Sequence, residues 1–177
     1  MAYWCLNEVQ AAALKSLVSG RVITDLGAGD LSLAHFLIDF GATQVIAIDK
    51  EPLPRRCDSG RVNYIRSYFE AYYEPIDVAV ISWPPNHCIG LTRLCQRANR
   101  VIYIGKNTDG TACGNLELFA HLLTREVSVY LPTRPNTLIC YEGASRVSRR
   151  PKGEELAAIA CGRADPVLHF EEVEGSL

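Results

Sequence analysis

The sequence predicts an α/β fold in which helices cover both faces of a mostly parallel seven-stranded sheet, giving three αβα layers. Short apolar runs of the parallel-strand kind alternate with helix-like segments along the chain. Between Arg21 and Asp49, a strand, a glycine-containing turn, a helix and a second strand follow one another. Near the end, two apolar runs are joined by PTRPN, which is too short for a crossover helix, so these runs are expected to pair antiparallel as a terminal hairpin.

Length and composition indicate one globular domain. The chain has 177 residues, enough for a full core but hardly for two independent domains. Its net charge of −2 is not the basic excess that indicates nucleic acid, although it leaves room for a local patch. We therefore predict a single domain over residues 1–177, with its core at about 7–142 and a C-terminal extension at 143–177.

The cysteines indicate a reducing compartment. There are 7, an odd number, and none forms a CxxC pair. With no signal peptide in front of them, reduced thiols and a cytoplasmic location are expected. His87 and Cys88 are adjacent ligand types, but no second pair follows at a suitable spacing, so no metal site is predicted. No apolar run is long enough to span a bilayer, so no membrane contact is expected.

The first half of the chain alternates predicted helices and strands. Helices are expected from Asn7 to Ser19 and after the glycine turn as far as Gly41, and strands at 21–25, 45–48 and 62–65. The apolar positions of the two helices are Val9, Ala13, Leu14, Leu17 and Val18 in the first and Leu33, Phe36, Leu37 and Phe40 in the second. An aromatic cluster at 68–73 is expected to form a short helix that packs on the sheet.

The second half continues the pattern. Strands are expected at 78–81, 101–104, 127–131 and 137–141, with a polar, glycine-rich loop at 105–114 as a candidate lid. Helices are expected before and after the 101–104 strand, and a short one at 154–160. The apolar faces are Leu91, Leu94, Cys95 and Ala98 in the first and Leu116, Phe119, Ala120 and Leu123 in the second.

The turn between the first two strands carries the main functional signal. Gly27 and Gly29 let a ligand approach the backbone, and Asp49, at the end of the second strand, can hold a ribose. This pattern indicates a nucleoside-bearing cofactor, although a tight connection without a ligand is the alternative. A dinucleotide fingerprint has a third glycine where Ser32 stands, which disfavours a nicotinamide oxidoreductase.

The segment DLGAG, with Asp25, Gly27 and Gly29, resembles the first motif of class I S-adenosylmethionine-dependent methyltransferases. The resemblance covers roughly residues 7–142 and includes the antiparallel hairpin, which dinucleotide dehydrogenases lack. It implies that the glycine turn passes under the methionine part of the cofactor and that Asp49 takes the ribose hydroxyls. A cofactor with an ammonium group and no phosphate suits acids at Asp25 and Asp49. The family often has a further glycine at the position of Leu31.

The resemblance extends the predicted cofactor site to the ends of other strands. It places Ser67, just past the third strand, at the adenine. Lys50, next to Asp49, and Ser82, at the end of the fourth strand, complete the predicted cofactor-binding set.

The fourth strand leads into SWPPNH, which resembles the fourth motif of amino-methylating members of the family. That motif is a polar residue, Pro-Pro and an aromatic; here Trp83 and Asn86 stand in the polar and aromatic places. Two prolines remove backbone donors and leave carbonyls to accept from a substrate. The acceptor-facing residues predicted here are Trp83, Pro84, Asn86 and His87, the last as a candidate general base.

Other interpretations of this turn stay open. Ser82 or Asn86 could supply the hydrogen bond while Trp83 stacks on cofactor or substrate, or the segment could be a structural strand-to-helix turn.

The predicted function is S-adenosylmethionine-dependent methyl transfer to an acceptor that the sequence does not identify. An amine is one candidate, on a small molecule or exposed on a macromolecule, and the charge does not point to nucleic acid. The alternative is a catalytically silent cofactor-binding or interaction module of the same fold. A basic cluster within 146–152 is either solvated surface or a contact for an anionic partner.

Overall fold

The computed structural model describes residues 6–52, 60–88, 90–106, 114, 116–132 and 136–143. Most of the candidate lid, the predicted helix at 154–160 and the basic cluster at 146–152 lie outside the described residues.

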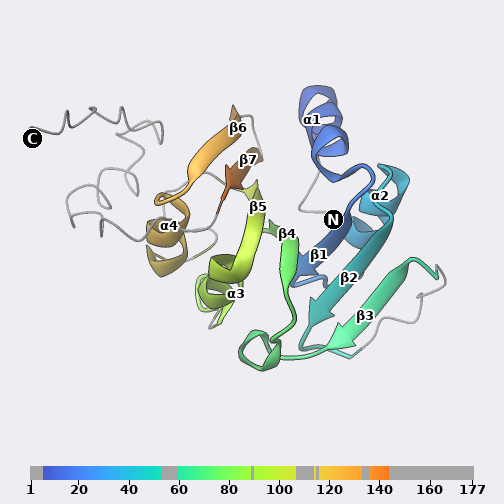
Figure 1. The fold of residues 1–177 in the computed structure, drawn as a ribbon, viewed down its shortest axis with the longest axis vertical. Helices are drawn as coiled ribbons and strands as arrows, with labels where there is room; N and C mark the ends of the chain where they lie inside the picture. The colour runs from blue at the N-terminus through green and yellow to red at the C-terminus, as the bar shows by residue number, and fades with distance from the viewer. Residues whose placement is uncertain are drawn as a thin grey trace, which may run out of the picture.

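One sheet organises the described residues, and helices flank it (Figure 1). Its strands are β1 (Val22–Leu26), β2 (Gln44–Asp49), β3 (Val62–Arg66), β4 (Ile76–Ser82), β5 (Ala98–Gly105), β6 (Glu126–Pro132) and β7 (Thr137–Glu142). The helices are α1 (Glu8–Val18), α2 (Ser32–Asp39), α3 (Leu91–Arg97), α4 (Leu116–Leu122) and the 3₁₀ helix η1 (Phe69–Ala71).

The sheet has seven strands in the order β3-β2-β1-β4-β5-β7-β6. The pairs among β1 to β5 are parallel, whereas β7 is antiparallel to both β5 and β6. The predicted mixed sheet with its antiparallel hairpin is therefore confirmed. The antiparallel strand itself lies one place in from the edge, which β6 forms. Since the chain runs outward from β1 to β3 and then returns to β4, the strand order reverses between β1 and β4, where open α/β sheets bind ligands.

Apolar residues on both faces of the sheet build the core. On one face, Leu14 of α1 and Leu37 of α2 pack in a cluster with strand residues such as Val80. On the other, Leu94 of α3 and Leu118 of α4 belong to a second cluster. This arrangement is the predicted three-layer sandwich, and it leaves the carboxyl ends of the parallel strands as the place for a site.

Two predicted helix faces are wrong in part. Val9 of α1 is 64% exposed, whereas the neighbouring Gln10 is buried. In α4, Leu116 is 58% exposed, and the buried positions are Leu118, Phe119, His121 and Leu122. Both helices carry overlapping apolar stripes, and periodicity cannot choose between them. Packing against the sheet determines which stripe is buried.

Helix α2 is also rotated from its predicted face. Its buried residues are Leu33, Ala34, Leu37 and Ile38. Phe36 and Phe40 are half-buried and pack on each other with ring centroids 4.1 Å apart. In α3, Leu91, Leu94 and Cys95 are buried as predicted, but Ala98 belongs to β5.

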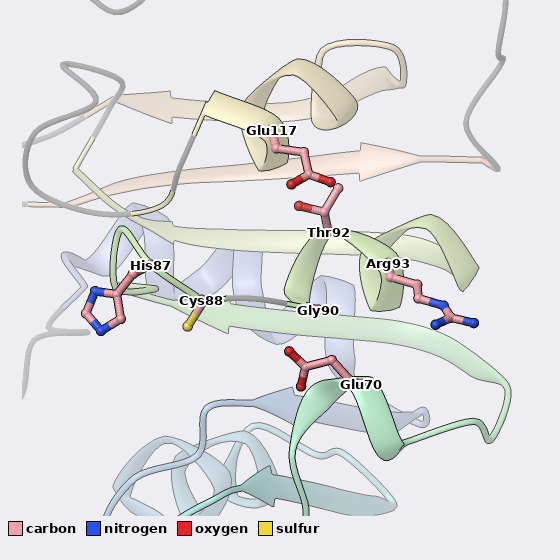
Figure 2. A pocket seen from close by; sticks show the side chains of 7 residues that line it. All are labelled: Glu70, His87, Cys88, Gly90, Thr92, Arg93 and Glu117. Atoms are coloured by element: carbon pink, nitrogen blue, oxygen red, sulfur yellow. The ribbon is translucent and has the colours of Figure 1, made fainter.

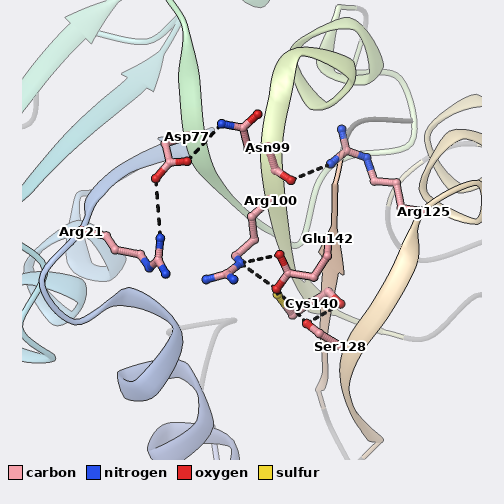
Figure 3. A network of polar contacts seen from close by, with 8 residues as sticks. All are labelled: Arg21, Asp77, Asn99, Arg100, Arg125, Ser128, Cys140 and Glu142. Carbon is pink, nitrogen blue, oxygen red and sulfur yellow. Dashed lines mark hydrogen bonds and ion pairs between the residues drawn. The ribbon is translucent and has the colours of Figure 1, made fainter. Parts of the chain in front are cut away.

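A network of polar contacts crosses the sheet at the end where the parallel strands begin (Figure 3). Arg100 of β5 pairs with Glu142 of β7 at 2.8 Å, and Arg21 lies 3.8 Å from Asp77 of β4. The network lies opposite the carboxyl ends of the parallel strands, so it links neighbouring strands away from the predicted site.

Arg125, between α4 and β6, is only 4% exposed and binds the end of α3. Its Nη2 donates to the carbonyls of Cys95 and Ala98 at 2.5 and 2.8 Å. A cation at a helix C-terminus satisfies carbonyls that have no partner within the helix and interacts favourably with the helix dipole.

We expect Arg125→Ala to lower the free energy of unfolding by about 3 kcal/mol, because it leaves buried carbonyls unpaired and removes a packed side chain. Chemical denaturation measures this. The control is Arg93→Ala, which removes an exposed arginine from α3, the helix whose end Arg125 binds. It should change the free energy of unfolding by about 0.5 kcal/mol or less. Equal effects of the two substitutions would contradict the capping role.

Candidate functional site

The turn after β1, residues 27–31, rests against the end of β2. Gly27 and Gly29 have φ values of 84° and 53°, in the left-handed region that glycine adopts without strain. The backbone N–H groups of Gly27 and Ala28 both donate to the Ile48 carbonyl, at 2.9 and 3.2 Å. The glycines therefore let the chain fold back closely on its neighbouring strand.

Asp49 fixes the same contact through its side chain. Its Oδ2 accepts from the Gly29 N–H at 2.9 Å, and its Oδ1 accepts from the Glu51 N–H at 3.0 Å. The half-buried carboxylate is thus oriented at the end of β2. Because an ionised carboxylate has about four acceptor positions, it can also accept from the hydroxyls of a ligand.

Asp25 lies beneath the turn and is almost fully buried. It is 1% exposed, and its Oδ2 has no hydrogen-bond partner among the described residues. Burial, followed by the negative charges of Asp49 and Asp30, raises the pKa of the Asp25 carboxyl to about 7. Three acids around one turn favour a positively charged ligand group, which would stabilise the ionised form of Asp25.

Asp25 should make the protein less stable as pH rises. The folded carboxyl keeps its proton up to about pH 7, whereas in the unfolded chain it ionises near its ordinary pKa of 3.8. Between these values the native state binds more protons, so its free energy of unfolding falls with increasing pH. We expect Asp25→Asn to be more stable than the wild type at pH 8, by on the order of 4 kcal/mol, and the difference to disappear near pH 4.

Chemical denaturation of both proteins across this range checks the prediction. Asp39→Asn, which removes an exposed acid from α2, is the control and should change the free energy of unfolding by about 0.5 kcal/mol or less across the same range. A constant difference between Asp25→Asn and wild type at all pH values would contradict the assignment.

Leu31 occupies a position where the backbone favours glycine. Its φ is 66° and its ψ is 6°, in the left-handed region, yet its side chain is fully buried. This is the position at which a further glycine is common in the family that the motif resembles. Burial of a leucine contributes more than the roughly 1–2 kcal/mol of backbone strain costs, which explains how this chain tolerates the side chain.

Leu31→Gly and Leu31→Ala should both destabilise the protein, with the glycine variant the more stable by about 1 kcal/mol, because alanine keeps the left-handed strain. At Leu37, which is buried in α2, the order should be reversed, since alanine is favoured over glycine in a helix. Thermal and chemical denaturation of the four variants test this inversion. The same order at both positions would contradict the strain at Leu31.

The other predicted cofactor residues gather at the ends of β2 and β3. Ser67 donates its N–H to the Asp49 carbonyl at 2.9 Å, and the Arg66 Nε donates to the Lys50 carbonyl at 3.3 Å. Asp49, Lys50 and Ser67 therefore form one edge of the candidate site. Ser82, half-buried at the end of β4, lies on the opposite side of β1.

The turn after β4 makes hydrogen bonds within the chain through its proline carbonyls. Trp83 has a φ of 48°, a left-handed conformation that a bulky residue rarely adopts. The Pro84 carbonyl accepts from the Gly114 N–H at 2.5 Å, and the Pro85 carbonyl accepts from the Cys88 N–H at 3.2 Å. Each of these two carbonyls therefore already accepts one hydrogen bond within the chain, and its second lone pair is the acceptor position that stays available to a substrate.

Asn86 and His87 are exposed beyond this turn. His87 lines a cavity of about 430 Å³ on the α3 and α4 side of the sheet (Figure 2). The lining residues are Glu70, His87, Cys88, Gly90, Thr92, Arg93 and Glu117. The lining of this cavity includes none of the predicted cofactor residues, so the cavity that His87 lines is not the predicted cofactor site.

Among the buried polar residues that the sequence analysis did not predict, Gln10 and Asn136 lie in one hydrogen-bonded group with Trp83. Gln10 is 1% exposed and Asn136 is fully buried, and Asn136 accepts a hydrogen bond from the Trp83 indole. Asn7 followed three residues later by Gln10 is a readable capping box, and both of its hydrogen bonds are present. The sequence gives no sign that Gln10 also reaches the end of the sheet.

The described ranges contain neither a group of three or more possible metal ligands placed to hold an ion nor a helix long and apolar enough to cross a membrane.

Several solved structures share this fold. A protein of Pyrococcus horikoshii assigned as an RNA methyltransferase superposes with a TM-score of 0.59 at 14% identity, covering 84% of this chain and 93% of the other. Magnesium protoporphyrin IX methyltransferase from Synechocystis, with bound S-adenosylmethionine, gives 0.58 at 13% identity, with 77% of each chain covered. A 1,6-didemethyltoxoflavin-N1-methyltransferase from Burkholderia thailandensis, with bound S-adenosylhomocysteine, gives 0.56 at 16% identity and the same coverage of 77% and 77%.

The chain thus has the fold of the class I S-adenosylmethionine-dependent methyltransferases, as its first motif predicts. No protein-family model and no curated protein matches its sequence. At such low identities the likeness shows the fold, and function has to be argued from the site.

Proposed function

We propose that this protein binds S-adenosylmethionine at the carboxyl ends of β1 and β2 and transfers its methyl group to an acceptor. The observation that carries the proposal is the contact between the glycine turn and Asp49, whose carboxylate is held by the Gly29 N–H at 2.9 Å. An oriented acceptor of hydroxyl groups thus lies beside a close approach of the backbone, one strand away from the gap between β1 and β4 where the strand order reverses.

The chemistry of the donor set fits this cofactor. Asp25, Asp30 and Asp49 surround the turn, and the buried Oδ2 of Asp25 has no partner within the described part of the chain. An ammonium group is attracted to such a site, whereas the diphosphate of a dinucleotide is repelled by it. The bound cofactors in the Synechocystis and Burkholderia structures support the same choice.

The residues of this chain would act mainly by positioning. The bound cofactor supplies a methyl group on a reactive sulfonium, and the protein's part is to align an acceptor with it. We assign Asp25, Gly27, Gly29, Asp49, Lys50, Ser67 and Ser82 to the cofactor, and Trp83, Pro84, Asn86 and His87 to the acceptor side. The exposed His87 is the candidate base for an acceptor that must lose a proton.

The second candidate is a catalytically silent module that binds the cofactor and serves an interaction. It is favoured by the turn after β4, where the Pro84 and Pro85 carbonyls accept from Gly114 and Cys88. The same bonds weaken the argument for an amine acceptor held by the Pro84 carbonyl. Cofactor binding without turnover on any acceptor would support this candidate.

Calorimetric titration with S-adenosylmethionine, S-adenosylhomocysteine and NADH tests the cofactor assignment. We expect both adenosyl ligands to bind and NADH not to bind. Asp49→Ala should weaken binding about 10- to 100-fold, as expected for loss of hydrogen bonds to a charged group.

Glu51→Gln is the matched control, since it removes an exposed acid next to this edge and keeps the backbone N–H that orients Asp49. It should bind the adenosyl ligands within about twofold of the wild type, a difference well below that of a lost charged hydrogen bond. Wild-type protein that binds neither adenosyl ligand would overturn the proposal.

A further inference from the structure

Trp83 is hydrogen-bonded to other parts of the fold through both its backbone and its side chain. Its backbone N–H donates to the Ile104 carbonyl of β5 at 2.8 Å. Its indole Nε1 donates to Oδ1 of Asn136 at 2.6 Å, next to the start of β7. The side chain therefore reaches from the end of β4 past β5, along the edge of the sheet where the predicted site lies. A left-handed φ at a tryptophan persists only where the surroundings hold it in place.

Asn136 is in turn held by α1. The Gln10 Nε2 donates to the Asn136 carbonyl at 2.8 Å and to the Leu131 carbonyl at 3.1 Å. The Gln10 Oε1 accepts from the Asn7 N–H at 3.2 Å, so both ends of the Gln10 amide are used. One buried glutamine thus fixes the chain on either side of the β6–β7 connection.

The pairing of β6 with β7 does not require the side chains of Gln10 and Asn136. Thr137 already pairs with Gly105 of β5 and with Pro132 of β6, which closes the hairpin. Buried amides are costly unless all their groups are satisfied, and a satisfied buried network specifies one arrangement of the groups that it joins. The group at the outer end of this network is the Trp83 indole, at the strand ends.

We infer that Asn136 and Gln10 are positioning residues that hold the Trp83 indole in place as part of the methyl-transfer site. The role of Trp83 in methyl transfer rests on the proposed function. The series of hydrogen bonds from Gln10 through Asn136 to the Trp83 indole, called the tether below, rests on the structure itself. It also has a chemical consequence. The indole N–H is the side chain's one hydrogen-bond donor and Asn136 takes it, so Trp83 meets a ligand through its ring rather than through a hydrogen bond.

NMR of protein labelled with ¹⁵N-tryptophan tests the tether in the ligand-free protein. The chain has 2 tryptophans, so Trp4→Phe assigns the resonances. We expect the Trp83 indole N–H to exchange slowly with solvent in the wild type. In Asn136→Leu and in Gln10→Met, exchange should be at least tenfold faster. Unchanged exchange in both variants would overturn the inference.

Asn7→Ala is the matched control for Gln10→Met. It removes the capping partner of Gln10 but leaves both Nε2 hydrogen bonds, so exchange at Trp83 should stay slow.

Trp83→Phe protects the test against a variant that fails to fold, because it removes the N–H and keeps an aromatic ring. In that background, Asn136→Leu should have a smaller effect on the melting temperature than in the wild type. An equal effect in the two backgrounds would mean that Asn136 does not act through Trp83.

Titration with S-adenosylhomocysteine tests the place of Trp83 in the site. Trp83 directly follows Ser82, which we assign to the cofactor, so we expect the ligand to shift the backbone and indole resonances of Trp83 in the wild type. Gln10→Met should bind with a dissociation constant within about threefold of the wild type, since the acids at the glycine turn are intact, but the shift at the indole should change. Binding that leaves the Trp83 resonances unmoved would overturn the positioning role. Failure of the ligand to bind would overturn the proposed function. The exchange measurement would still show whether Gln10 and Asn136 hold the Trp83 indole.

Discussion

The contact between the glycine turn and the end of β2 is the constraint on which the candidate site depends. The N–H groups of Gly27 and Ala28 converge on the Ile48 carbonyl, and the N–H of Gly29 binds the Asp49 carboxylate. These bonds hold the turn against the end of β2 and orient the acid that we assign to the cofactor. Without left-handed glycines the turn could not approach the strand this closely.

The same turn gathers acidic side chains around one buried carboxyl group, that of Asp25. Asp25 lies beneath it with its pKa raised to about 7, while Asp30 and Asp49 lie around it. Such crowding lowers stability at neutral pH, and the two apolar clusters that sandwich the sheet offset it. A site that destabilises the free protein in this way gains from binding a cation, because the ligand relieves the repulsion between the carboxylates.

The two sides of the candidate site are organised differently. The cofactor side is made of strand ends and one turn, all close together in the parallel part of the sheet. The side that we assign to the acceptor draws on distant segments, because Trp83 is hydrogen-bonded to Asn136 and Asn136 to Gln10. Changes in α1 or in the β6–β7 connection can therefore alter the acceptor side and leave the glycine turn untouched. This separation is consistent with a fold that serves many acceptors.

Local patterns in the sequence determined the seven strands, the glycine turn with Asp25 and Asp49, and the antiparallel pairing of β6 with β7, because strand runs, tight turns and short links are decided by neighbouring residues. The tertiary structure alone decided that α1 buries Gln10 and exposes Val9, that α4 exposes Leu116, and that Gly114 takes the Pro84 carbonyl. Each of these depends on contacts between residues far apart in the chain. A stripe of apolar side chains predicts that a helix packs, but the surface it meets selects which side chains are buried and which polar groups find partners.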